Sequence, residues 1–275
     1  MLKEFGMALN RKGIPVLMYH DLVQRSSKER YGYYEIWEQE FEAQVRLLTK
    51  LNFEFILLED LKSNRTFSSK SVIITFDDGH VSNYTIAFPI LTKIGLRAEF
   101  FVTANQIGQK NRVHAEHLRE MARYGMRIGS HGLTHTYLDN LSYEEAKREL
   151  QRSKEILSNI IGKTVCSFSA PGGRFRKRDI KLAKDCGYLF FCTSRPGFLK
   201  KNTSPLNIPR MLIPKGDINQ FHKIVSLDPC LYLRRRAIYS VLRTAKRILG
   251  NKNYEKIHSI IIRKIQGESI AMIPF

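Results

Sequence analysis

The chain has 275 residues, of which 43% are hydrophobic and 26% are charged, a composition typical of a globular protein with one large domain. The formal net charge of +19 at pH 7 predicts attraction to anionic partners, although charge alone does not identify them. The sequence contains no run of eighteen apolar residues, no signal-peptide pattern near Met1 and no CxxC spacing among its four cysteines, so a spanning helix, a leader and a zinc ribbon are not predicted.

Apolar strand-like runs alternate with amphipathic helical segments from residue 15 to about residue 213. A polar and aromatic stretch over 24–34 predicts a loop, and the Ser-Tyr-Glu-Glu run at 142–145 is a capping box that opens a long helix. This alternation predicts an α/β fold with a parallel sheet and crossover helices. The predicted strands are 15–20, 53–56, 72–76, 98–103, 126–130, 165–169, 188–193 and 206–212, and the predicted helices are 37–51, 83–94, 115–124, 143–161 and 177–186.

Two adjacent carboxylates, Asp77 and Asp78, follow directly after the apolar run 72–76. Neighbouring negative charges are costly unless a positive group lies beside them, and a metal ion is the usual solution. Two histidines four positions apart, His131 and His135, follow the next strand but one. One carboxylate and two imidazoles suit zinc or a similar divalent ion and leave positions open for water and substrate.

His20 and Pro171 also follow predicted strands. Because the carboxyl ends of parallel strands meet at one edge, these residues and the four above are expected to lie together. A (β/α) barrel has its active site at that edge, and an open doubly wound sheet would also bind ligands there. The sequence contains neither GxGxxG nor a P-loop motif, so no nucleotide site is predicted.

Four runs resemble motifs of the polysaccharide deacetylases, the NodB-like carbohydrate esterase family 4. They are Thr-Phe-Asp-Asp-Gly at 75–79, His-Gly-Leu-Thr-His at 131–135, Pro-Gly-Gly at 171–173 and Pro-Val-Leu-Met-Tyr-His at 15–20, the last as in a subgroup that includes exopolysaccharide deacetylases. The resemblance covers roughly residues 14–215. It implies a distorted, TIM-like (β/α)7 barrel that removes acetyl groups from N-acetylated sugars, or in some members O-acetyl groups.

The resemblance also implies roles for these residues. Hydrolysis of an amide needs an activated water, a clamp for the oxyanion and an acid for the leaving nitrogen. Asp78, His131 and His135 would hold one divalent metal, zinc before cobalt, nickel or iron, and Asp77 would be the general base for the metal-bound water. The expected substrate and oxyanion side of the site comprises Pro171, Gly172, Gly173 and Arg174.

The general acid is predicted to be His20, with Asp21 beside it, because no Leu-x-His motif, which supplies the acid in many members, is found near the C-terminal end of the domain. His222 is the alternative. The tryptophan of the family's fourth motif is also absent, since the single tryptophan is Trp37.

A second departure lies before the third motif. Many members have an arginine two residues before the proline, where it pairs with the base, but this chain has Ser169. Arg174 or Arg176 would compensate, or Asp77 would remain unpaired. The departure motivates an alternative function, a catalytically weak or inactive carbohydrate-binding descendant of the same fold.

The last segment, 228–275, is basic and amphipathic. It predicts either two helices that pack on the barrel or peripheral contact with an anionic membrane surface. We therefore expect an N-terminal extension (1–13), a catalytic domain (14–227) and a basic helical tail (228–275), in a cytoplasmic protein that is free or bound at the inner face of the cell membrane. The expected substrate is an acetylated glycan or a lipid-linked glycan. The net charge is the sole argument for nucleic acid, and no specific nucleic-acid partner is predicted.

Overall fold

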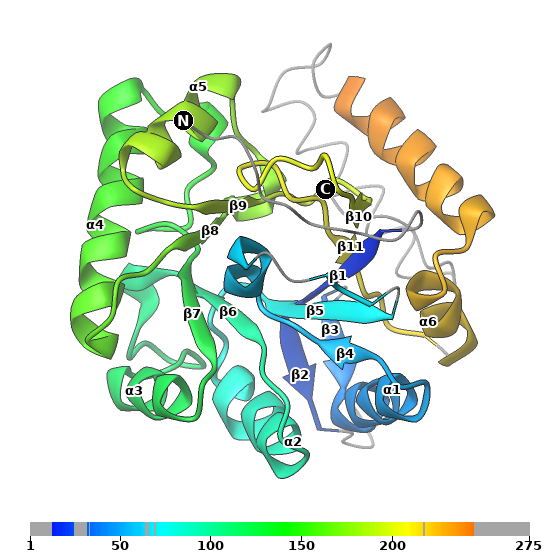
Figure 1. The fold of residues 1–275 in the computed structure, drawn as a ribbon. Coiled ribbons are helices and arrows are strands. Elements are labelled where there is room, and N and C mark those ends of the chain that lie inside the picture. Colours follow the sequence, from blue (N-terminus) through cyan, green and yellow to red (C-terminus); the bar gives the residue numbers. More distant parts are fainter. Residues whose placement is uncertain are drawn as a thin grey trace.

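The computed structural model describes residues 13–24, 32, 34–63, 66–68, 70–216 and 218–244. A curved sheet forms the centre, with strand order β10-β1-β5-β6-β7-β8-β9, and helices cover its outer face (Figure 1). The strands are β1 (Ile14–Tyr19), β2 (Asp21–Val23), β3 (Glu35–Trp37), β4 (Glu54–Phe55), β5 (Ser71–Phe76), β6 (Glu99–Val102), β7 (Arg127–Ser130), β8 (Ser167–Ser169), β9 (Phe190–Cys192), β10 (Phe198–Leu199) and β11 (Met211–Leu212).

The helices on the outer face follow the strands in chain order, as the sequence predicted. They are α1 (Glu38–Lys50), α2 (Phe88–Lys93), α3 (Ala115–Arg123), α4 (Tyr143–Ile161), α5 (Lys177–Asp185) and α6 (Ile218–Val225), with short helical turns η1 (Leu58–Lys62), η2 (Asn83–Ala87), η3 (Ala104–Gln106), η4 (Leu138–Asn140) and η5 (Pro171–Gly173). A further helical segment begins at residue 229 and continues to residue 244, where the description ends. None of the described helices is long and apolar enough to cross a membrane.

The segment 208–212 joins the two edges of the parallel sheet. Ile208 forms a parallel bridge with Cys192 at the end of β9. Three residues later, β11 pairs in parallel with β1 through Leu17 and Met211. The sheet therefore closes into the distorted barrel that was predicted, and residues 209–210 lie where its two edges meet.

Alternating residues of the strands face two different cores. Leu17, Ile74 and Phe76 belong to the cluster that includes Phe41 and Val45 of α1, so they lie between sheet and helices. Residues of the opposite parity fill the barrel interior, and these are Val16, Ile73, Phe101, Phe190, Cys192 and Ile208. By the same parity, side chains at 75, 77 and 210 point into the barrel above this inner core.

Two parts of the fold differ from the prediction. The loop expected over 24–34 is flanked by a short parallel pair, β2 and β3, with Asp21 opposite Glu35; residues 25–31 and 33 lie outside the described part. The helix expected over 83–94 is a π-helical turn, η2, followed by α2. Pro89 lacks the N–H that a continuous α-helix would donate to residue 85, which accounts for the change of hydrogen-bond pattern there.

Candidate active site

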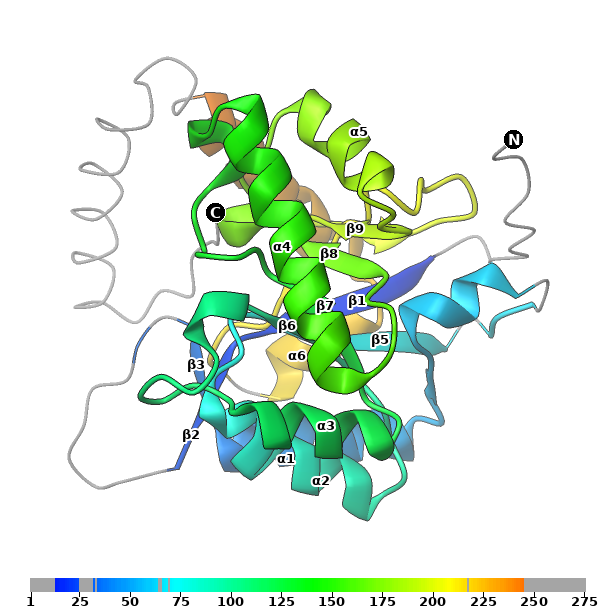
Figure 2. The same ribbon diagram turned by 90° about the vertical axis from the view of Figure 1, so that its left-hand side faces the viewer.

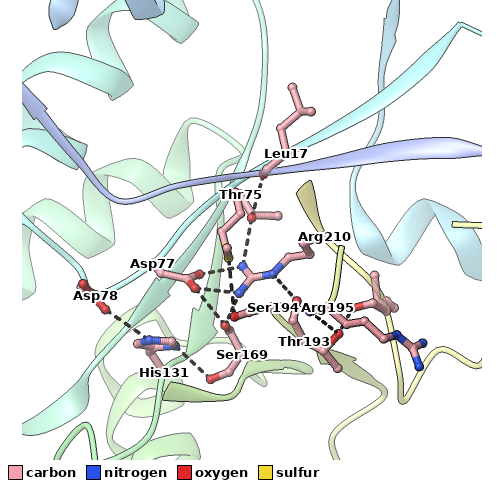
Figure 3. A network of polar contacts seen from close by, with 12 residues as sticks. Leu17, Thr75, Asp77, Asp78, His131, Ser169, Thr193, Ser194, Arg195 and Arg210 are labelled. Carbon is pink, nitrogen blue, oxygen red and sulfur yellow. Dashed lines mark hydrogen bonds and ion pairs between the residues drawn. The ribbon is translucent and has the colours of Figure 1, made fainter. Parts of the chain in front are cut away.

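The two carboxylates after β5 point in different directions. Asp77 continues the sheet, because its N–H donates to the carbonyl of Tyr19 at 2.9 Å, and its side chain enters the barrel with 2% of the residue exposed. Asp78 and Gly79 both adopt left-handed backbone angles, with φ of 72° and 70°. Asp78 therefore points toward His131, whereas Asp77 points toward Arg210 (Figure 3). A Cβ at position 79 would lie 3.0 Å from Cγ1 of Val102, so the turn requires glycine.

Asp78, His131 and His135 come together in space. Oδ1 of Asp78 lies 3.2 Å from Nε2 of His131 and 3.1 Å from Nε2 of His135. One ligand atom from each of the three residues lies within 4.8 Å of the other two. The structure thus assembles the three side chains that were predicted to hold a metal ion.

The orientation of His131 suits a metal ligand. Its Nδ1 lies 2.9 Å from the carbonyl oxygen of Ser169. Because a carbonyl oxygen only accepts, Nδ1 carries the proton, and in the neutral ring the lone pair is on Nε2, which faces Asp78. A backbone partner that fixes this tautomer is usual for metal-binding histidines. The residues therefore fit a divalent metal ion.

Asp77 is paired with Arg210, a residue that the sequence analysis did not single out. The guanidinium donates to both carboxylate oxygens at 2.7 Å, and the Arg210 side chain is completely buried (Figure 3). The same guanidinium also bonds Thr75 Oγ1 at 3.1 Å, Ser169 Oγ at 2.7 Å and the carbonyl of Thr193 at 3.1 Å. Burial is the largest effect and raises the pKa of Asp77, but the charge and hydrogen bonds of Arg210 together with nearby His131 and His20 outweigh it, so the pKa lies below its ordinary value.

The prediction that Arg174 or Arg176 replaces the missing arginine was wrong. Arg174 is bound to Asp139 and stacks on Tyr137, with its Cζ 4.1 Å from the ring centroid. Arg176 donates to the carbonyl of Asp139. The hydroxyl oxygen of Ser169 accepts a hydrogen bond from Arg210, and its carbonyl oxygen bonds the ring of His131. Because serine is small, it leaves room for Arg210, which comes from the segment just before β11.

His20 lies at the end of β1 and faces the site. Its Nδ1 is buried with no hydrogen-bond partner in the described part of the chain, and its ring centroid lies 4.5 Å from that of Tyr34. Burial lowers the pKa of His20, and the charges of Asp78 and Asp77 partly oppose this. His222, the alternative acid, is exposed on α6.

Asp21 and His80 flank the cluster on one side. His80 lies between two carboxylates, with Nε2 3.4 Å from Asp78 Oδ2 and Nδ1 3.4 Å from Asp21 Oδ2. Ser82 donates a short hydrogen bond to Asp21. His80 therefore lies beside the Asp78 carboxylate.

The third motif forms the turn η5 after β8. Gly172 and Gly173 adopt left-handed angles, with φ of 58° and 64°, and Pro171 is buried. A Cβ at position 172 would lie 2.7 Å from the ring of Tyr137, so the loop after β7 packs directly on this turn. The oxyanion role of this turn stays a prediction.

Comparison with known proteins agrees with the site. The family profile described as polysaccharide deacetylase matches residues 64–191. The protein YxkH of Bacillus subtilis, which carries the name of a polysaccharide deacetylase, is 30% identical over 207 residues, covering 74% of this chain and 72% of YxkH. The chain belongs to the polysaccharide deacetylase family.

Other members are more distant in sequence. The poly-beta-1,6-N-acetyl-D-glucosamine N-deacetylase of Staphylococcus aureus is 25% identical over 208 residues, 68% of this chain and 71% of that protein. The structure of IcaB from Ammonifex degensii has the same fold, with a TM-score of 0.69 at 24% identity over 80% of this chain and 98% of IcaB. As a polysaccharide deacetylase the chain is a hydrolase that acts on carbohydrate, as its motifs predicted.

Proposed function

We propose that this polysaccharide deacetylase hydrolyses the N-acetyl group of an N-acetylhexosamine-containing polysaccharide, oligosaccharide or glycolipid precursor. The observation that carries the proposal is the buried Asp77–Arg210 pair beside the Asp78, His131 and His135 cluster. A base held in its ionised form next to a metal-binding cluster is the arrangement that hydrolysis by water needs. The name of the S. aureus relative, an N-deacetylase of poly-N-acetylglucosamine, supports the substrate class.

Each residue of the site would have a separate role in the hydrolysis. A divalent ion at the cluster would polarise the acetyl carbonyl and lower the pKa of water. Asp77 would accept the proton of the attacking water, and Arg210 keeps that carboxylate ionised and aligned through two hydrogen bonds. His20 would protonate the leaving nitrogen, because it lies close enough to Asp77 and Asp78 to interact with their charges and its Nδ1 has no hydrogen-bond partner in the described part of the chain. The backbone N–H of Gly172 would bind the acetyl oxygen as it gains charge.

Zinc is the proposed metal, since one carboxylate and two imidazoles suit it, and cobalt, nickel and iron are the alternatives.

The competing function is a carbohydrate-binding protein with little or no catalysis. That hypothesis was motivated by Ser169 in place of an arginine, and the Arg210 side chain supplies the charge that Ser169 lacks. The enzyme is therefore the better-supported proposal.

Acetate release and bound metal, measured on the same preparations, test the proposal. The native protein should contain near-stoichiometric zinc by elemental analysis and release acetate from one member of a panel of N-acetylated glycans. Asp77→Asn should keep the metal and lower acetate release by about 10²–10⁴-fold, since it removes the base. Because it also leaves Arg210 buried without its charged partner, the comparison is made at a temperature at which the variant is still folded. Asp78→Ala should lose both.

The outcomes separate the two functions. Full turnover by Asp77→Asn would remove Asp77 as the base. A metal-loaded native protein that binds the glycans but releases acetate from none of them would favour the carbohydrate-binding alternative.

We further propose that the helix over 229–244 contacts the inner face of an anionic cell membrane. A lipid-linked glycan at that face would then be the substrate. Leu233 and Val241 on this helix are 62% and 67% exposed, and Arg234 and Arg243 beside them are exposed as well. Exposed apolar residues flanked by cations are typical of helices that bind anionic lipid surfaces. The remainder of the predicted tail, 245–275, lies outside the described residues.

A further inference from the structure

A buried carboxylate on α4 faces the short loop between the two histidine ligands. Glu149 is 6% exposed, and α4 crosses the outside of β7, the strand that ends just before His131 (Figure 2). Its Oε2 accepts from the backbone N–H groups of Leu133 and Thr134 at 2.7 and 3.0 Å. Its Oε1 accepts from the hydroxyl of Thr134 at 2.6 Å. All three donors therefore belong to residues between His131 and His135.

The loop has a shape that needs such a partner. Gly132 and His135 adopt left-handed angles, with φ of 83° and 68°. Successive N–H groups in a turn of this kind converge on one point and form an anion-binding nest. In this chain the anion is the carboxylate of Glu149, which lies so close that a Cβ at position 132 would be 3.0 Å from Oε2.

The carbonyl groups of the same loop are held from the other side. Ala104 and Asn105, at η3, donate their N–H groups to the carbonyls of Gly132 and Leu133 at 3.0 and 2.9 Å. Glu149 thus binds the donors of the loop while η3 binds its acceptors. If the carboxylate is removed, the donors at 133 and 134 lose their partner while the acceptors keep theirs, so the turn is free to change shape.

We propose that Glu149 is a positioning residue for the metal centre: it fixes the turn over 132–134 and thereby the separation and angle of the His131 and His135 rings. The two ring centroids lie 5.1 Å apart, and both Nε2 atoms face Asp78. His131 is also held by the carbonyl of Ser169, but His135 depends on the turn that Glu149 stabilises. This inference rests on the proposed metal site and adds a residue that does not touch the metal.

Zinc affinity, measured by competition with a chromophoric chelator, tests the proposal in the full chain. Glu149→Gln keeps the shape of the side chain but removes its charge, so the two N–H groups lose a charged acceptor and the Thr134 hydroxyl must turn to accept from the new amide group. We expect zinc affinity to fall by about 10–100-fold, the range for loss of a group that orients a metal ligand. Amide hydrogen exchange at Leu133 and Thr134 should become faster in the same variant.

Two control variants separate positioning from general destabilisation. Leu150→Ala removes a fully buried side chain from the next position of α4, so it should lower the free energy of unfolding and leave zinc affinity unchanged. Glu155→Gln removes an exposed carboxylate from the same helix and should change neither quantity.

Native-like zinc affinity and native-like exchange at 133 and 134 in Glu149→Gln would overturn the proposal. Equal loss of zinc affinity in Leu150→Ala would also overturn it, because the effect would then be one of stability. If the native chain itself takes up no zinc, the metal centre fails and this inference fails with it. Normal zinc uptake without acetate release would instead refute the proposed deacetylation alone.

Discussion

A carboxylate and a guanidinium remain charged inside a protein when they face each other, as Asp77 and Arg210 do through two bonds of 2.7 Å. Breaking such a pair from one side costs about 3–5 kcal/mol, because the remaining charge is buried without a partner. Arg210 has further bonds to Thr75, Ser169 and Thr193, so it also ties β5 and β8 to the segment that closes the barrel.

Arg210→Met keeps an unbranched apolar side chain and removes the charged guanidinium. We expect the free energy of unfolding at pH 7 to fall by about 3–5 kcal/mol, since Asp77 is left unpaired. Adding Asp77→Asn should recover part of this loss, with a coupling of about 1–3 kcal/mol in a double-mutant cycle measured by urea unfolding. Strictly additive losses would mean that the two side chains do not stabilise each other.

The candidate metal-binding cluster and the neighbouring Asp77 were predictable because each residue belongs to a short run that follows a strand: Asp77 and Asp78, then His131 and His135. Arg210 was not, since it is separated from Asp77 by 133 positions and belongs to no motif that the resemblance contained. Two signals point to it in hindsight. Ser169 leaves the base without its usual partner, and Arg210 is the charged residue at an inward position of the predicted last strand, two residues after Ile208.

At the scale of elements, the amino end of β6 carries a buried carboxyl group far from the active-site rim. Glu99 is 2% exposed and accepts hydrogen bonds from Leu58 N at 3.0 Å and Ser167 Oγ at 3.2 Å. Burial is the main cause that raises its pKa from 4.5 to about 7; nearby Glu59 also raises it and Arg127 lowers it. The folded state therefore holds the proton more tightly than the unfolded chain does.

This difference sets the direction of a pH effect. The stability that protonated Glu99 contributes is fully present below pH 4.5 and is lost as the pH rises to about 7. The loss amounts to about 3 kcal/mol, from the size of the pKa difference. Glu99→Gln mimics the protonated form. Between pH 5 and pH 8 its free energy of unfolding, measured with urea at each pH, should fall less than that of the native chain. Parallel pH profiles of the two proteins would show that Glu99 does not titrate in this range.

The predicted elements were right where the hydrophobic periodicity and the capping residues indicate the same element. The long helix α4 is an example, since the side chain of Ser142 accepts a hydrogen bond from the N–H of Glu145 at its start. They failed where tertiary contacts decide. The short pair β2 and β3 exists because Asp21–Val23 has Glu35–Trp37 as a neighbour, which no local pattern reveals. Similarly, the strand predicted over 206–212 is reduced to Met211–Leu212, because Ile208 pairs with Cys192 at one edge whereas Met211 and Leu212 pair with β1 at the other.

At the scale of the whole molecule, the chain carries a net charge of +19 and ends its described part in a helix that packs by one side only. Tyr232 contacts Phe198, with ring centroids 5.1 Å apart, and Arg235 donates to the carbonyl of Leu212 at 2.8 Å. Val241 does not take part in this packing, since it is 67% exposed. Helical spacing places it with Leu233 on the outer side.

Co-sedimentation with vesicles tests whether this outer side binds lipid. We expect binding to vesicles that contain phosphatidylglycerol, little binding to phosphatidylcholine alone, and a decrease with added salt because the attraction is partly electrostatic. Replacing both Leu233 and Val241 by Glu should abolish binding, and Arg243→Gln should weaken it about fivefold, the equivalent of about 1 kcal/mol per cation. Leu189→Glu, at another exposed apolar residue, is the matched control and should bind as the native chain does. Equal binding to neutral vesicles, or a double variant that binds normally, would place the contact elsewhere than on this helix.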